Sequence, residues 1–81
     1  MHYFIYGITY NGGRFSVDKV FPYNLEDEVD KMESTIRYFG GGSVTIYDID
    51  YDSVNISSHY NVVSTQNEID DQITVDDDSE I

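Results

Sequence analysis

Residues 43–52 read SVTIYDIDYD, and this stretch organises the expected fold. A β-strand sends successive side chains to opposite faces. A strand over these residues therefore has two sets of side chains, one being Thr45, Tyr47, Ile49 and Tyr51 and the other Asp48, Asp50 and Asp52. We predict that the first face is suited to burial and that the second presents a row of carboxylates.

A helix is predicted immediately before this strand, from Leu25 to the Gly40-Gly41-Gly42 run that ends it. Its apolar residues recur with the 4-3-4-3 spacing of an amphipathic helix, at Leu25, Val29, Met32, Ile36 and Phe39. Asn24 is expected to cap the helix start, and Asp27 to complete a variant of the capping box. The stripe predicts a helix that covers one face of a sheet.

A β-hairpin is predicted at the N-terminal end. His2–Tyr10 and Arg14–Val20 are separated by Asn11-Gly12-Gly13, residues that accept the positive φ angles of a tight turn. Both faces of the first strand are apolar, which predicts a central strand or one covered on both sides. The second strand alternates, with Phe15, Val17 and Phe21 expected to face inward.

The chain after the central stretch is expected to turn at Asp52-Ser53 and to return either as two strands, Val54–Ser57 and Tyr60–Ser64, or as one bent strand with a bulge near Ser58-His59. The sum is an α+β fold, a small antiparallel sheet of about four strands in which a β-hairpin, one helix and a second β-hairpin follow in order. Residues 1–65 form the domain. Residues 66–81 carry seven acids and no base, which predicts an acidic, mostly disordered tail in which 73–75 could add an edge strand.

Charge is the strongest compositional signal. Sixteen Asp and Glu against four Lys and Arg give a net charge of −12, and residues 38–81 hold ten acids and no base. Such a chain repels nucleic acid and anionic membranes, so its expected partner is a basic protein surface. The sequence has no cysteine, and its first ten residues lack the features of a signal peptide or a membrane span. We expect a soluble, cytoplasmic protein.

Metal binding and catalysis are not expected. Asp48, Asp50 and Asp52 match the opening of a calcium-binding EF-hand loop, but Ser53 stands where glycine is needed and His59 where a bidentate Glu belongs. The two histidines, His2 and His59, belong to no recognisable catalytic triad. A chain of this length also leaves little room for a pocket. We predict no enzyme activity, metal or cofactor.

Carboxylates on alternate strand residues lie about 6.8 Å apart, about twice the 3.4 Å rise between phosphates on one DNA strand. Neighbouring carboxylates at that spacing repel, which a basic partner would relieve. Tyrosine rings between them can stack on arginine. The candidate partner-binding residues are those of the central stretch, the helix and the tail: Asp48, Asp50, Asp52, Tyr47, Tyr51, Glu26, Asp27, Asp30, Glu33, Asp76, Asp77 and Asp78.

These features predict a non-enzymatic inhibitor that imitates nucleic acid and occupies the basic nucleic-acid-binding surface of another protein. In composition and size, though in no motif, the chain is similar to the small acidic inhibitors that phages and mobile elements direct against restriction systems, CRISPR effectors, nucleases and repair enzymes. The alternative is a structural or adaptor domain that joins an assembly by β-edge pairing or by forming a homodimer. Binding that survives high salt would favour the alternative.

Overall fold

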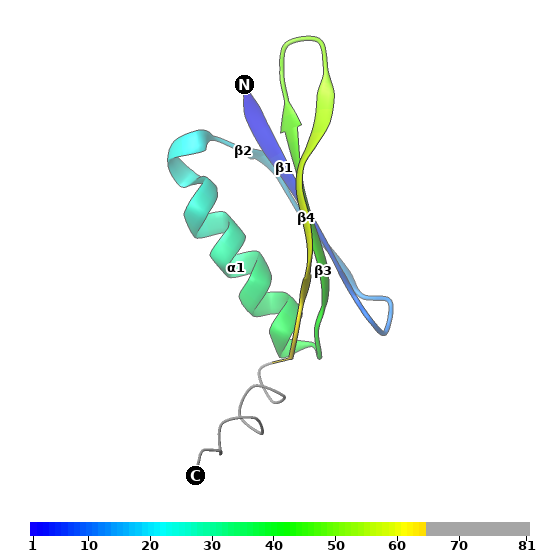
Figure 1. The fold of residues 1–81 in the computed structure, drawn as a ribbon. Coiled ribbons are helices and arrows are strands. Elements are labelled where there is room, and N and C mark those ends of the chain that lie inside the picture. Colours follow the sequence, from blue (N-terminus) through cyan, green and yellow to red (C-terminus); the bar gives the residue numbers. More distant parts are fainter. Residues whose placement is uncertain (65–81) are drawn as a thin grey trace.

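The computed structural model describes residues 1–64 and shows one antiparallel sheet covered on one face by a helix (Figure 1). Its elements are β1 (His2–Thr9), β2 (Arg14–Val20), a 3-10 turn η1 (Pro22–Asn24), α1 (Leu25–Tyr38), β3 (Gly42–Ile49) and β4 (Val54–Val62). The four strands lie in the order β2-β1-β3-β4. The predicted α+β class, strand number and single covering helix are confirmed, whereas the predicted tail over residues 66–81 lies outside the described residues.

β1 is a central strand, as its two apolar faces predict. It pairs with β2 on one side and with β3 on the other, so that Tyr3 lies between Val20 and Asp48. The turn from β1 to β2 is closed by the Gly13 carbonyl, which accepts from Thr9 N at 2.8 Å, and Gly12 takes the positive φ of 95° that this turn requires.

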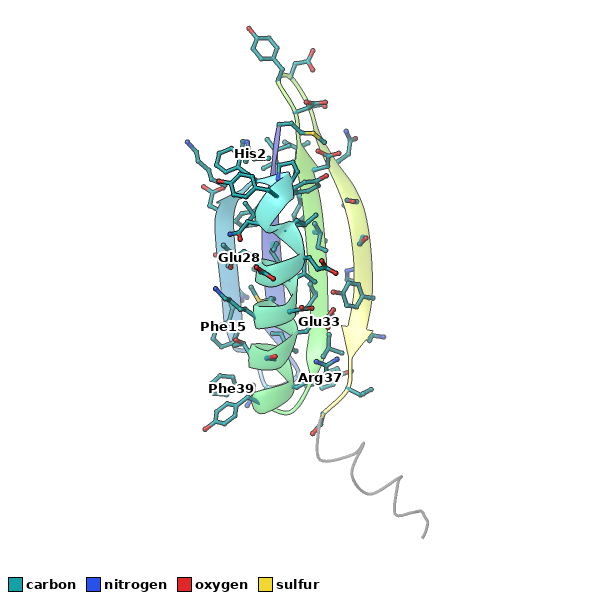
Figure 2. The ribbon with its side chains drawn as sticks, turned by 90° about the vertical axis from the view of Figure 1, so that its left-hand side faces the viewer. His2, Phe15, Glu28, Glu33, Arg37 and Phe39 are labelled. Carbon is teal, nitrogen blue, oxygen red and sulfur yellow. The ribbon has the colours of Figure 1, made fainter. Side chains whose placement is uncertain are left out.

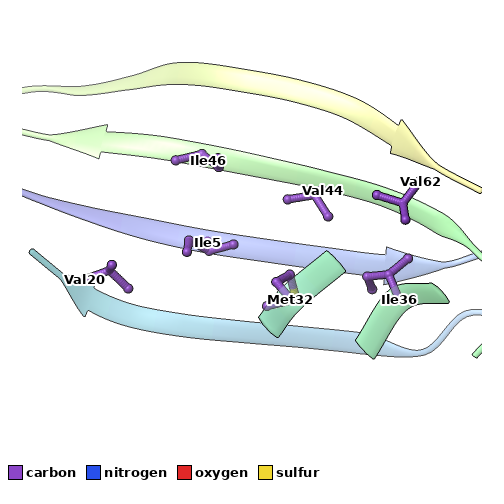
Figure 3. Close-up of a cluster of buried hydrophobic side chains, with 7 residues drawn as sticks. All are labelled: Ile5, Val20, Met32, Ile36, Val44, Ile46 and Val62. Carbon is purple, nitrogen blue, oxygen red and sulfur yellow. The ribbon is translucent and has the colours of Figure 1, made fainter. Parts of the chain in front are cut away.

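The core lies between α1 and one face of the sheet (Figure 3). It consists of Ile5, Val20, Met32, Ile36, Val44, Ile46 and Val62. Helix and sheet approach most closely over Gly7, where a Cβ atom would lie 2.7 Å from Met32 Sδ and 2.8 Å from Ile36 Cδ1. The absence of a side chain at Gly7 therefore allows α1 to pack directly against β1.

A β-bulge in β2 changes which residue enters the core. Tyr3 pairs with Val20 and Ile5 with Val17, so β2 has one more residue than β1 between these two pairs. Lys19 accommodates it with a φ of 56°, and its N–H donates to Asp18 Oδ1 at 2.8 Å. The prediction that Phe21 faces inward is wrong, because the bulge turns Val20 inward and leaves Phe21 44% exposed.

The helix has the predicted stripe but not the predicted cap. Met32 and Ile36 are buried, and Leu25 and Val29 pack beside them. Asn24 occupies the N-cap position without a side-chain cap hydrogen bond, because its Nδ2 donates to Glu28 Oε2 at 3.2 Å. At the other end the Phe39 ring stacks on Phe15 with centroids 5.4 Å apart.

Of the two alternatives for the returning chain, the structure confirms the single bulged strand. β4 runs unbroken, and its bulge lies at Ser57, between the pairs Ile46 with Ser58 and Tyr47 with Ile56. β3 ends at Ile49, and Asp50 N donates to Ser53 O at 2.8 Å to close the turn. The predicted strand through Asp52 is therefore three residues too long, because 50–52 belong to the turn.

Candidate functional site

The two sides of β3 are the reverse of the prediction. Val44 and Ile46 are buried in the core beneath α1. Asp48 follows them in the same alternation and lies on the helix side, half-buried, with its Oδ1 buried and lacking a hydrogen-bond partner within residues 1–64. The predicted row of carboxylates does not form, because Asp50 and Asp52 are in the turn and Asp48 is on the covered side of the sheet.

Exposed carboxylates nevertheless collect at one end of the molecule. Val20 at the end of β2 and Asp48 near the end of β3 both pair with Tyr3 of β1, so the two strands end at the same end of the sheet. α1 begins a few residues after β2. The start of the helix and the β3–β4 turn are therefore at the same end of the sheet (Figure 1). This acidic end carries the exposed residues Glu26, Asp27, Asp30, Asp50 and Asp52, with the fully exposed Tyr51 at the turn.

Glu33 lies apart from the acidic end and makes contacts within the fold (Figure 2). It accepts a hydrogen bond from the Tyr60 hydroxyl and pairs with Arg37, whose Nη2 lies 3.5 Å from Glu33 Oε1. Burial, then the hydrogen bond to Glu33, raises the pKa of Tyr60 above its usual value. Glu33 and Arg37 lie on α1 and Tyr60 lies on β4, so the Glu33 carboxylate links the helix to the edge strand. The remaining predicted residues, Asp76, Asp77 and Asp78, lie outside the described part of the chain.

The face of the sheet opposite α1, here called the open face, carries a group of neighbouring apolar side chains. Phe4, Tyr6, Tyr47, Ile49 and Val54 line a shallow hollow of about 390 Å³ in it. The Phe4 and Tyr47 rings, from neighbouring strands, have centroids 5.9 Å apart. No helix or strand within residues 1–64 covers this face.

The hollow is bordered by further apolar and paired polar side chains. Ile56 lies opposite Tyr47 in the sheet and is 64% exposed. Farther along the same face, Thr45 Oγ1 and His59 Nδ1 are 2.8 Å apart and form a hydrogen bond between β3 and β4. The Thr45–His59 hydrogen bond satisfies one polar atom of each of these two side chains.

The open face carries almost no acidic residues despite the charge of the chain. β1, β3 and β4 together contain a single carboxylate, that of Asp48, which lies on the helix side. The carboxylate of β2, Asp18, lies at the bulge on the sheet edge, next to Lys19. Carboxylates are therefore nearly absent from the strands that form the hollow.

The two edges of the sheet are protected unequally. The edge strand β2 carries Arg14, Asp18 and Lys19 as well as a bulge, features that discourage pairing with another strand. The edge strand β4 has no charged residue or proline and is interrupted only by the bulge at Ser57. Among residues 1–64, β4 is therefore the edge more open to pairing.

Other types of site receive no support from the part of the chain that the structure describes. His, Asp and Glu residues nowhere come together there in a group of three that could hold a metal ion. The same residues include no helix long and apolar enough to cross a membrane. The two histidines contact different groups: His59 Nδ1 lies 2.8 Å from Thr45 Oγ1, and the His2 ring lies 6.3 Å from the Phe21 ring.

Comparison with known proteins adds no assignment to these surfaces: no protein-family model matches the chain, and neither the curated proteins nor the solved structures give a significant match.

Proposed function

We propose that this chain is a non-enzymatic protein-binding domain that joins an assembly through the open face of its sheet. The observation that carries the proposal is the hollow formed by Phe4, Tyr6, Tyr47, Ile49 and Val54 on a face that no described element covers. Contiguous exposed apolar surface is uncommon on soluble monomers and marks interaction sites.

The residue types support this proposal. Tyrosine and phenylalanine are enriched in protein interfaces because they offer large, rigid contact areas, and tyrosine keeps a polar tip. Complete burial of an aliphatic or aromatic side chain contributes about 1.5–3 kcal/mol, and Val54 and Ile56 are each 64% exposed in the isolated chain. A partner that covers the open face gains much of that contribution.

A matched pair of substitutions tests the proposal. Tyr47→Lys places a charge beside the hollow, whereas Tyr38→Lys makes the same change on α1, where Tyr38 is 82% exposed and outside the open face. The full-length variants are used to capture proteins from the native cell, and the interaction is repeated with the purified partner.

The proposal requires that binding be lost with Tyr47→Lys and kept with wild type and Tyr38→Lys, with circular dichroism showing that all three are folded. A purified partner that binds Tyr47→Lys as tightly as wild type would contradict it.

A second function is favoured by the acidic end. Glu26, Asp27 and Asp30 in the first half of α1 and Asp50 and Asp52 in the β3–β4 turn are all exposed, and they could bind a basic, nucleic-acid-binding surface of another protein. This is the nucleic-acid-mimicking inhibitor of the anti-defence type, acting in the cytoplasm of a host cell. Its carboxylates would act through charge rather than through phosphate-like spacing, since they do not lie in one strand.

Charge reversal separates the two functions. Asp50→Lys combined with Asp52→Lys should weaken binding through the acidic end and leave binding through the open face intact. Binding through the acidic end should also fall steeply between about 50 and 200 mM salt. A partner that is insensitive to both changes and is lost with Tyr47→Lys would exclude the acidic end as its binding site.

A further inference from the structure

We infer that the open face binds a second copy of this chain, so that two sheets pack face to face with both helices on the outside. This inference rests on the proposed function and adds the identity of the occupant. Three properties of the open face support self-association: its low content of carboxylates, its area and its shape.

Charge distribution permits self-association on this face of the molecule. Two chains of net charge −12 repel each other, and an interface rich in carboxylates would add to that repulsion. β1, β3 and β4 contribute no carboxylate to the open face, because Asp48 points to the helix side. The edge strand β2 carries one carboxylate, that of Asp18, together with the bases Arg14 and Lys19. Two open faces can therefore meet while the acidic helices and turns remain in solvent.

The area of the face suits a small dimer interface. Strands of eight residues, as in β1 and β3, extend about 26 Å, and four strands span about 19 Å. The face therefore measures about 500 Å² on each copy, and a pair would bury about 1,000 Å². That value is at the lower limit for specific protein interfaces, so we expect a dimer of moderate affinity.

The shape of the face is self-complementary. Ile56 projects from β4 directly beside Tyr47, which lines the hollow, so each copy offers both a projecting side chain and a depression. In a twofold dimer a contact between residues i and j occurs twice, and one such pair of features is sufficient. Sheets packed in this way lie about 10 Å apart with interdigitated side chains.

Sedimentation equilibrium on the full-length chain tests the inference. The range of about 1 μM to 1 mM includes the micromolar dissociation constants expected of a small apolar interface. We expect the wild-type mass to rise from 9.3 kDa toward twice that value, 18.6 kDa, as concentration increases. Added salt should strengthen the dimer, because it screens the repulsion between two acidic chains.

Variants assign the association to the open face. Tyr47→Lys and Ile56→Lys should remain at 9.3 kDa throughout, and Tyr38→Lys should behave as wild type. Ile56 is 64% exposed, so we expect the Ile56→Lys chain to fold. This variant therefore still tests the open face if the Tyr47→Lys chain does not fold. A wild-type chain that is monomeric at all concentrations, or a folded Ile56→Lys chain that dimerises like wild type, would overturn the inference. If the wild-type chain is monomeric but still binds a different partner through Tyr47, self-association is refuted and the proposed protein-binding function is not.

Discussion

Replacement of Gly7 by alanine tests how closely α1 packs on the sheet. A methyl group at this position would lie 2.7 Å from Met32 Sδ and 2.8 Å from Ile36 Cδ1, well inside the separation of about 3.5–4.0 Å at which non-bonded carbon atoms attract. Met32 has a flexible side chain that can move. Ile36 is fully buried and β-branched, so it cannot move without disturbing the core.

Two opposing effects set the magnitude. Alanine in place of glycine restricts the unfolded chain and by itself adds about 0.4–1 kcal/mol of stability where the backbone tolerates it. Overpacking a well-filled core costs about 1–3 kcal/mol. We therefore expect Gly7→Ala to lower the free energy of unfolding by about 1–2 kcal/mol, measured by urea denaturation followed by circular dichroism.

A double-mutant cycle identifies the cause. Ile36→Val deletes Cδ1, one of the three atoms that lie nearest the new methyl, at a cost of about 0.5–1.5 kcal/mol in the wild-type chain. In the Gly7→Ala chain the same deletion should cost less, with a coupling energy of at least about 0.5 kcal/mol. Ile46→Val deletes a methyl group elsewhere in the core and should not couple. A Gly7→Ala chain more stable than wild type, or equal coupling for both valine substitutions, would refute the proposed close packing over Gly7.

Two further predictions concern single residues of the described fold. The pKa of Tyr60 is raised above its usual 10.0 in the folded state, so its contribution to stability is full below pH 10 and falls as the pH rises above it, by up to about 1.4 kcal/mol per pH unit. Tyr60→Phe should abolish this part of the alkaline loss in urea titrations at pH 8 to 11, and an unchanged pH profile would contradict it. Lys19→Gly should raise the melting temperature by relieving about 1 kcal/mol at its φ of 56°, whereas Lys31→Gly, within α1, should lower stability by about 1 kcal/mol. A drop in stability with both substitutions would show that Lys19 is not strained.

The sequence predicts the elements of this fold well because each has a local cause. The 4-3-4-3 stripe of α1, the glycines at its end and the Asn-Gly-Gly turn act within a few residues of chain. Bulges do not, since they depend on which residues of two strands are paired. The bulge at Lys19, and with it the inward position of Val20, could not be read from the period of β2 alone.

The orientation of β3 was mispredicted for an identifiable reason. Period-2 alternation correctly separates Tyr47 from Asp48, but Val44 and Ile46 share a side with Asp48 and decide which side the helix covers. Two buried aliphatic side chains outweigh one carboxylate at the end of the strand. Asp50 and Asp52 fall in the turn, where aspartate is favoured because its side chain bonds to nearby backbone.

The open face also has a signal in the sequence. Alternate residues of β1 are apolar on both faces, yet the chain supplies one predicted helix, which can cover a single face. An apolar strand with one covering helix leaves an unpaired apolar surface. Both candidate surfaces thus follow from one arrangement, in which most acids of the described chain occupy the helix and turn, and Phe4, Tyr6 and Tyr47 occupy the far side of the sheet.

The most direct test of self-association through the open face is to record which methyl groups lie between copies of the chain. Isotope-filtered nuclear Overhauser spectra of a mixture of ¹³C-labelled and unlabelled chains report only contacts between molecules. The open-face arrangement predicts such contacts from Ile49, Val54 and Ile56 and none from Leu25 or Val29, which pack between helix and sheet. Spectra with no contacts between copies, or with contacts confined to the helix side, would contradict it.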